Sequence, residues 1–142
     1  MTMNILAIGS ALALLPVIGA VSSDAADSAH VLNAKQQAEL DKVLAGKVAG
    51  KPVSCIDATR QPSLRVISDD VIVYTDGRRT AYRNDLIGRC PGLKWDDIPV
   101  IHSFGSRYCR GDFIRMVSRT SGIGGGGCAL GSFTPYKTPP AS

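Results

Sequence analysis

Short runs of apolar and β-branched residues recur through the middle of the chain and predict strands. Residues 64–67 and 71–75 form two such runs, and residues 79–83 form a third. Each has the length and composition of a short β-strand. Asp76 and Gly77 separate the last two runs, and Asp-Gly between two strand patterns is the strongest short hairpin pattern. We therefore predict a meander of three antiparallel strands.

The C-terminal segment 96–136 repeats this pattern and predicts three more strands. Cys109 and Cys128 stand just ahead of the second and third of them. The glycine run 122–127 is expected to form a mobile hairpin tip between them. Residues 84–97 read as a loop, and we expect its tryptophan, Trp95, to pack onto the edge of the core.

One helix is expected before the strands, from Ala34 to about Ala45. Asn33 and Gln36 have the spacing of a capping box, and Gly46 is a typical helix stop. The apolar stripe of this segment is narrow, so we expect the helix to lie outside a sheet and to cover one edge or end. A first strand is expected around residues 53–57.

Six or seven short strands with one N-terminal helix predict an α+β, mostly β fold with an antiparallel, barrel-like sheet that is stapled by disulfides. The predicted organisation is a signal peptide (1–25), an N-terminal helix and linker (26–52), the stapled β domain (53–136) and a disordered tail (137–142).

Residues 5–20 are apolar apart from Gly9, Ser10, Pro16 and Gly19, and small residues follow them. This pattern is typical of a secretory signal peptide, with cleavage expected between Ala20 and Ala29. A buried helix is the alternative. The run is shorter than the about twenty residues that a membrane span needs, so no span is expected after cleavage. We predict a periplasmic or secreted protein.

The number and positions of the cysteines agree with export. All four, Cys55, Cys90, Cys109 and Cys128, lie in the predicted mature chain, and an even number in an oxidising compartment predicts two disulfides. A zinc site would need closely spaced pairs such as C-x-x-C, and the chain has none. No metal or cofactor is predicted.

The formal net charge is +4, with ten Arg and six Lys against eleven Asp and one Glu. Such a chain associates weakly with anionic surfaces. The candidate anion-binding residues are Arg78, Arg79, Arg107 and Arg110, if the two tips that carry them converge. Aromatic residues do not interleave with these arginines, so no specific nucleic acid is expected. The partner is unknown, with an anionic envelope component or another protein as the options.

Catalytic chemistry has few candidates in this sequence. His102 is the one histidine of the predicted β domain, and it alternates with Ile98 and Val100, so a partly buried structural role is expected. With Asp112 it forms the runner-up acid and base pair. The glycine run satisfies G-x-G-x-x-G, but a cysteine and a strand follow it where a dinucleotide site needs a helix.

Three stretches resemble a known family: LAGKVAGKPVSCI (44–56), SFGSRYCRGDFI (103–114) and CALGSFTPY (128–136). They are similar to a family of small exported proteins of proteobacteria, common in sphingomonads and known as a domain of unknown function. Some relatives look like lipoproteins, and this chain lacks their lipobox cysteine. The resemblance implies pairing of Cys55 with Cys109 and of Cys90 with Cys128. The nested pairing of Cys55 with Cys128 and Cys90 with Cys109 stays open.

Taken together, these patterns favour a non-enzymatic envelope protein that acts as a binding or structural module. The alternatives are a small secreted hydrolase that acts on an anionic polymer through His102 and Asp112, and a periplasmic enzyme inhibitor.

Overall fold

The computed structural model describes residues 30–95 and 97–140, and the predicted signal peptide (1–25) lies outside them. The described chain contains an α-helix, a 3₁₀ helix and ten short strands. Their bounds are α1 Ala34–Leu44, β1 Val48–Ala49, β2 Cys55–Asp57, β3 Ser63–Val66, β4 Val71–Asp76, β5 Thr80–Asp85, η1 Leu93–Trp95, β6 Ile98–His102, β7 Arg107–Cys109, β8 Phe113–Val117, β9 Gly124–Ala129 and β10 Phe133–Lys137.

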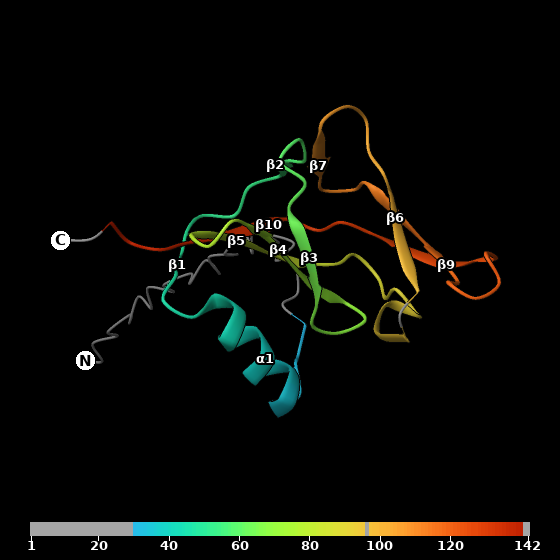
Figure 1. The fold of residues 1–142 in the computed structure, drawn as a ribbon, viewed down its shortest axis with the longest axis horizontal. Coiled ribbons are helices and arrows are strands. Elements are labelled where there is room, and N and C mark those ends of the chain that lie inside the picture. Colours follow the sequence, from blue (N-terminus) through green and yellow to red (C-terminus); the bar gives the residue numbers. More distant parts are fainter. Residues whose placement is uncertain (1–29, 96, 141–142) are drawn as a thin grey trace, which may run out of the picture.

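All strand pairs between these elements are antiparallel, and they form three sheets. The first has five strands in the order β1-β10-β5-β4-β3, the second pairs β2 with β7, and the third has the order β6-β8-β9 (Figure 1). The mostly β, antiparallel architecture with one helix is thus confirmed. The predicted barrel is not confirmed, because β1 and β3 end the five-stranded sheet at opposite edges and the sheets do not close.

The predicted meander is confirmed in β3, β4 and β5. Asp76 pairs with Thr80, so the hairpin loop is Gly77, Arg78 and Arg79. Gly77 has a φ of 62°, a left-handed conformation that glycine adopts without steric cost. The Asp-Gly pattern therefore identified the hairpin from local backbone preference alone.

Helix α1 begins with the predicted capping box. The Gln36 N–H donates to the Asn33 side chain, and the Asn33 N–H donates to the Gln36 side chain, both at 2.9 Å. Leu40 is buried and packs in a cluster with Val71, Val73 and Ala81 of the five-stranded sheet. The helix therefore covers one face of that sheet rather than an edge.

The other face of β4 builds the main core. Ile72 and Tyr74 belong to a buried cluster with Ile56 of β2 and with Ile114 and Met116 of β8. Successive residues of a strand point to opposite faces, so β4 contributes to both clusters and is buried along Val71 to Tyr74. The molecule has three layers: α1, the five-stranded sheet, and the two smaller sheets.

The expectation for the glycine run is wrong. Gly124–Ala129 is strand β9, which pairs with β8 and is not a hairpin tip. The turn comes earlier, at residues 118–123, where the Gly122 N–H donates to the Ser118 carbonyl. Glycine has a poor intrinsic preference for strands, so the sequence pattern favoured a loop.

The cysteines form two disulfides, Cys55–Cys109 and Cys90–Cys128. This is the pairing that the family resemblance implied. Cys55 and Cys109 are direct cross-strand partners on β2 and β7, whereas Cys90 ties the loop after β5 to β9. Two disulfides indicate an oxidising, extracytoplasmic environment.

Candidate functional site

The three-stranded sheet has one buried and one exposed face. Ile114 and Met116 of β8 point inward and are buried. The opposite side, here called the outer face, is formed by alternate residues of β6 and β8. They are Ile98, Val100, His102, Phe113, Arg115 and Val117.

The strand register arranges the outer face in rows. His102 lies opposite Phe113, Val100 opposite Arg115, and Ile98 opposite Val117. Ile98, Val100 and Phe113 are 40%, 39% and 51% exposed. Ile98 and Val100 are two residues apart on β6, and Val100 and Phe113 are diagonal neighbours across β6 and β8. Such neighbours lie about 7 to 8 Å apart, within reach of large side chains, so these residues form a contiguous apolar surface.

The glycines of β9 flatten this surface. A Cβ atom added at Gly127 would collide with the Phe113 ring, and one added at Gly124 would collide with the Arg115 guanidinium. The absence of side chains at these positions lets the ring and the guanidinium lie across the neighbouring strand. The glycine run is thus part of the site, as the floor of a flat platform.

Further exposed apolar side chains lie at the ends of these strands. Trp95 precedes β6 and is 83% exposed, Phe104 follows β6 and is 99% exposed, and Ile123 precedes β9 and is also exposed. The expectation that Trp95 packs onto the core edge is wrong, because Leu93 takes the buried position of the η1 turn. Exposed large apolar groups in such a concentration are a feature of interaction surfaces.

The charge of the outer face has one sign. Strands β6, β8 and β9 contain no Asp or Glu, and Arg115 is their only Arg or Lys. The platform is therefore apolar with a positive charge near its middle.

His102 and Asp112, the runner-up acid and base pair, take separate roles. His102 is exposed, contrary to the expectation of a partly buried side chain, and its ring lies 6.4 Å from the Phe113 ring. The Asp112 carboxylate accepts a hydrogen bond of 2.8 Å from the Cys109 N–H and so closes the turn before β8. Within the described residues, His102 forms no hydrogen bond or ion pair with a carboxylate.

The four candidate anion-binding arginines do not form one patch. Arg78 and Arg79 lie in the β4–β5 loop, whereas Arg107 is on β7 and Arg110 follows it, and these two places lie apart in Figure 1. Arg107 is the cross-strand partner of Asp57. The pKa of Asp57 lies below its ordinary value, first because the Thr59 hydroxyl and N–H donate to it and to a smaller degree because Arg60 and Arg107 are near.

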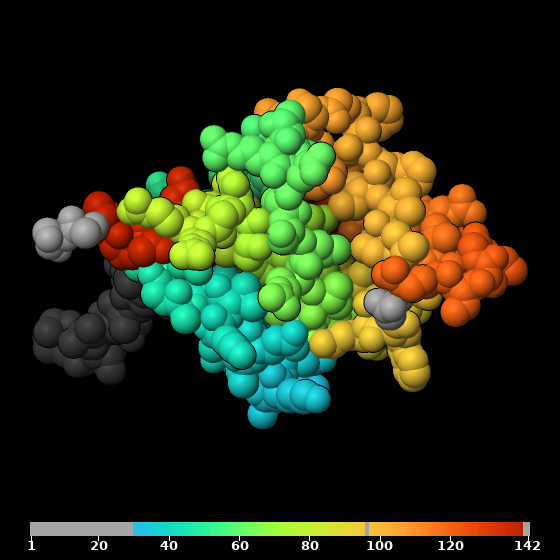
Figure 2. All heavy atoms as spheres, viewed as in Figure 1, coloured from blue at the N-terminus to red at the C-terminus, as the bar shows by residue number. Residues whose placement is uncertain are grey.

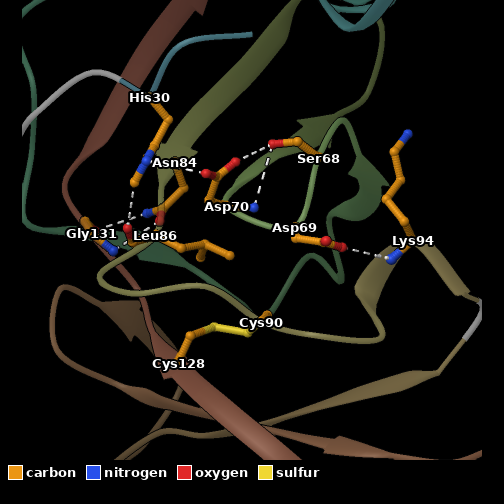
Figure 3. The surroundings of a disulfide bond; sticks show 10 residues. All are labelled: His30, Ser68, Asp69, Asp70, Asn84, Leu86, Cys90, Lys94, Cys128 and Gly131. Carbon is orange, nitrogen blue, oxygen red and sulfur yellow. Dashed lines mark hydrogen bonds and ion pairs between the residues drawn. A yellow bond between two sulfur atoms is a disulfide. The ribbon is translucent and has the colours of Figure 1, made fainter. Parts of the chain in front are cut away.

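His30 adjoins the predicted cleavage region and is part of a polar cluster. One ring nitrogen lies 3.2 Å from the Asp70 carboxylate and the other 2.9 Å from the Leu86 carbonyl oxygen (Figure 3). Both nitrogens face acceptors, so the ring forms both hydrogen bonds only when it is doubly protonated. Ser68 donates to the same carboxylate.

This cluster anchors the start of the described chain to the loops around the Cys90–Cys128 disulfide. The nearby Asn84 is fully buried and bonds both the N–H and the carbonyl of Gly131, each at 2.8 Å (Figure 3). The Asn84 amide is satisfied on both sides by the Gly131 backbone, and the His30, Asp70 and Ser68 side chains are engaged with one another and with the Leu86 carbonyl. We interpret the cluster as structural.

Comparison with family models, curated proteins and solved structures finds no match to the chain. The resemblance to the exported proteobacterial family therefore stays a prediction. In residues 30–95 and 97–140, no helix has the length and apolar character to cross a membrane. The same residues hold no cluster of three or more His, Cys, Asp or Glu side chains arranged for a metal ion.

Proposed function

We propose that this chain is an exported, non-enzymatic module that binds another protein through the outer face. The observation that carries the proposal is the exposure of Ile98, Val100 and Phe113 in adjacent rows of one sheet. Exposing such a surface to water is unfavourable, by about 25 cal/mol for each Å² of apolar area. Burial against a partner recovers that free energy.

The side chains of the outer face indicate which kind of surface its partner presents. Branched aliphatic side chains and a phenyl ring favour a dry, close-packed contact of the kind that proteins form. Arg115 stands among them without an acidic neighbour on its sheet. The partner is therefore an apolar protein surface that places an Asp or Glu opposite Arg115.

A second copy of the chain fits this surface less well. In a symmetric dimer the same patch meets itself. Two copies of the outer face would bring two Arg115 guanidinium groups toward one another without a carboxylate between them. Like charges opposed across an interface cost several kcal/mol.

The two disulfides and the predicted signal peptide support a periplasmic or secreted location for this binding. Inhibition of an exported enzyme is one form that such binding takes. The hydrolase alternative receives no comparable support, since Asp112 is engaged by the backbone of its own turn.

A photo-crosslinking amino acid at Val100 tests the proposal in the cells that export the protein. A matched position is Val48, which is 62% exposed on the five-stranded sheet. We expect a protein adduct from Val100 that Val48 does not give. Adducts with the chain itself, with lipid only, or equally from both positions would contradict the proposal.

Purified partner and chain then allow a quantitative measurement by calorimetry. Val100→Asp and Arg115→Glu should each weaken binding by roughly 30-fold, the effect of losing an interface hot spot of about 2 kcal/mol. Val48→Asp should change it by less than about twofold, as is usual outside an interface. Arg115→Glu should be rescued by an acid-to-Arg change in the partner.

A further inference from the structure

A second surface lies at the other end of the molecule, between α1 and the β3–β4–β5 meander. In Figure 2, α1 (teal and cyan) lies below the β4–β5 hairpin (yellow-green), while residues of the outer-face sheet (orange) lie at the opposite end. A groove of about 470 Å³ is formed here. Its charged lining residues are Glu39, Lys42, Lys47, Arg65 and Arg78.

The cations of this groove come from separate parts of the fold. Lys42 is in the last turn of α1, Arg65 is on β3, and Arg78 is in the β4–β5 loop. Lys47 follows the helix, and its ammonium donates to the Val43 carbonyl at 3.3 Å. Packing of α1 on the sheet brings these four side chains around one hollow, where their charges repel one another.

The carboxylates beside the groove do not neutralise it. Glu39 is the one acidic residue of its lining, and it is paired at 3.6 Å with Lys94, which lies outside the lining. Asp76, next to the lining residue Gly77, is paired at 3.3 Å with Arg60. Both negative charges are thus already offset by other cations.

Three of the groove cations have no ion pair in the described part of the chain, namely Lys42, Arg65 and Arg78. Arg83, by contrast, is held by Asp85 through two hydrogen bonds of 2.7 and 2.9 Å. The groove therefore contains cationic hydrogen-bond donors without a carboxylate partner, whereas the Arg83 guanidinium is paired within the chain. An external anion would satisfy them and relieve their repulsion.

We propose that this groove binds a small multivalent oxyanion, a ligand with at least two phosphate or carboxylate groups. Two guanidinium forks offer bidentate hydrogen bonds to such groups, and the two ammonium groups add point charges. The volume is within the range of about 300 to 1,000 Å³ that is common for small-molecule sites. This inference is independent of partner binding by the outer face.

The test is a titration of ¹⁵N-labelled protein with sodium pyrophosphate and, separately, with sodium citrate, each at constant ionic strength set with chloride. We expect saturable shifts of the backbone amides of Thr75, Gly77 and Arg78, which line or flank the groove. A response to pyrophosphate alone would identify phosphate as the recognised group, and a response to citrate alone would identify carboxylate. No saturable shift with either anion would overturn the inference.

Two double variants with the same change in net charge distinguish anion binding at the groove from general electrostatic attraction to the protein. Arg65→Gln with Arg78→Gln should weaken binding at least tenfold, because a charge-assisted hydrogen bond contributes roughly that factor. Arg89→Gln with Arg107→Gln, outside the groove, should change it less than about twofold. Equal weakening by both would overturn the inference. Lys42→Gln, a single change on the helix surface with little risk to the fold, should also weaken binding.

Discussion

Tyr74 is a core residue with a buried polar group that the described residues leave unsatisfied. The side chain is 2% exposed, packs against the rings of Tyr108 and Phe133, and its hydroxyl has no hydrogen-bond partner among the described residues. Burial raises the pKa of the Tyr74 hydroxyl well above its ordinary value, with Tyr108 adding to the effect. A buried hydroxyl without a partner costs free energy that folding must offset.

Tyr74→Phe should therefore stabilise the protein. We expect the free energy of unfolding at neutral pH to rise by about 1 kcal/mol, because the desolvated hydroxyl is removed while the ring contacts remain. Urea unfolding measures the change. Tyr82→Phe, at the half-buried cross-strand neighbour, is the control and should stay within about 0.5 kcal/mol. A loss of stability in Tyr74→Phe would show that the hydroxyl is hydrogen-bonded.

The pH dependence has a definite sign. The raised pKa of Tyr74 means that the folded state favours the neutral phenol, so its contribution is complete below the unfolded pKa of about 10 and is lost as the pH rises further. Unfolding curves at increasing alkaline pH should show a steeper loss of stability for the native sequence than for Tyr74→Phe. Parallel losses would contradict this assignment.

Strand β9 shows how an element can depend on side chains of its neighbour. Phe113 and Arg115 of β8 occupy the space above Gly127 and Gly124. Glycine at these two positions weakens the strand, but it leaves room for the Phe113 ring and the Arg115 guanidinium. The element is therefore stabilised by pairing with β8 rather than by its own sequence.

Gly127→Ala tests this dependence. The new methyl group would meet the Phe113 ring and the Ile114 carbonyl oxygen, so we expect the free energy of unfolding to fall by about 1 to 3 kcal/mol. Gly126→Ala is a matched control, since its methyl group would make only ordinary contact with Pro91. Chemical denaturation of both variants decides the point, and equal effects would argue against the flat platform.

The elements that the sequence predicted are those with local causes. The capping box of Asn33 and Gln36 and the hairpin at Gly77 depend on hydrogen bonds and dihedral angles within a few residues. Strand β1 was missed because two residues that pair with β10 carry no periodic pattern. The barrel was inferred from the number of strands, which does not determine how sheets close.

At the scale of the whole molecule, the disulfides hold the layers together. Cys90–Cys128 links the loop after β5 to β9, and Cys55–Cys109 links β2 to β7. The bridged residues are separated by 38 and 54 positions. Closing loops of this size in the unfolded chain corresponds to roughly 4 kcal/mol for each bridge. This is a large share of the about 5 to 15 kcal/mol of a typical domain.

Removal of each bridge by a pair of Cys→Ala changes should thus lower the free energy of unfolding by a few kcal/mol, in the range of about 2 to 5. The loss should be greater for Cys90 and Cys128, because both are buried in the main core while Cys55 and Cys109 are half-buried. Guanidinium unfolding of the two variants, with the native protein as reference, gives the comparison. The opposite order would show that the β2–β7 bridge is the more important link.

The sequence by itself determined the helix, the central meander and the presence of two disulfides, since each depends on local pattern or composition. Export stays a prediction. Only the tertiary structure decided which residues share a surface. Arg78 joins Lys42 and Arg65 rather than Arg107 because α1 packs on the same side of the meander as the hairpin loop. Phe113 is exposed and Ile114 buried because β8 lies in an outer sheet with a single covered face. Such neighbourhoods arise from contacts between residues far apart in the chain, and periodicity does not encode them.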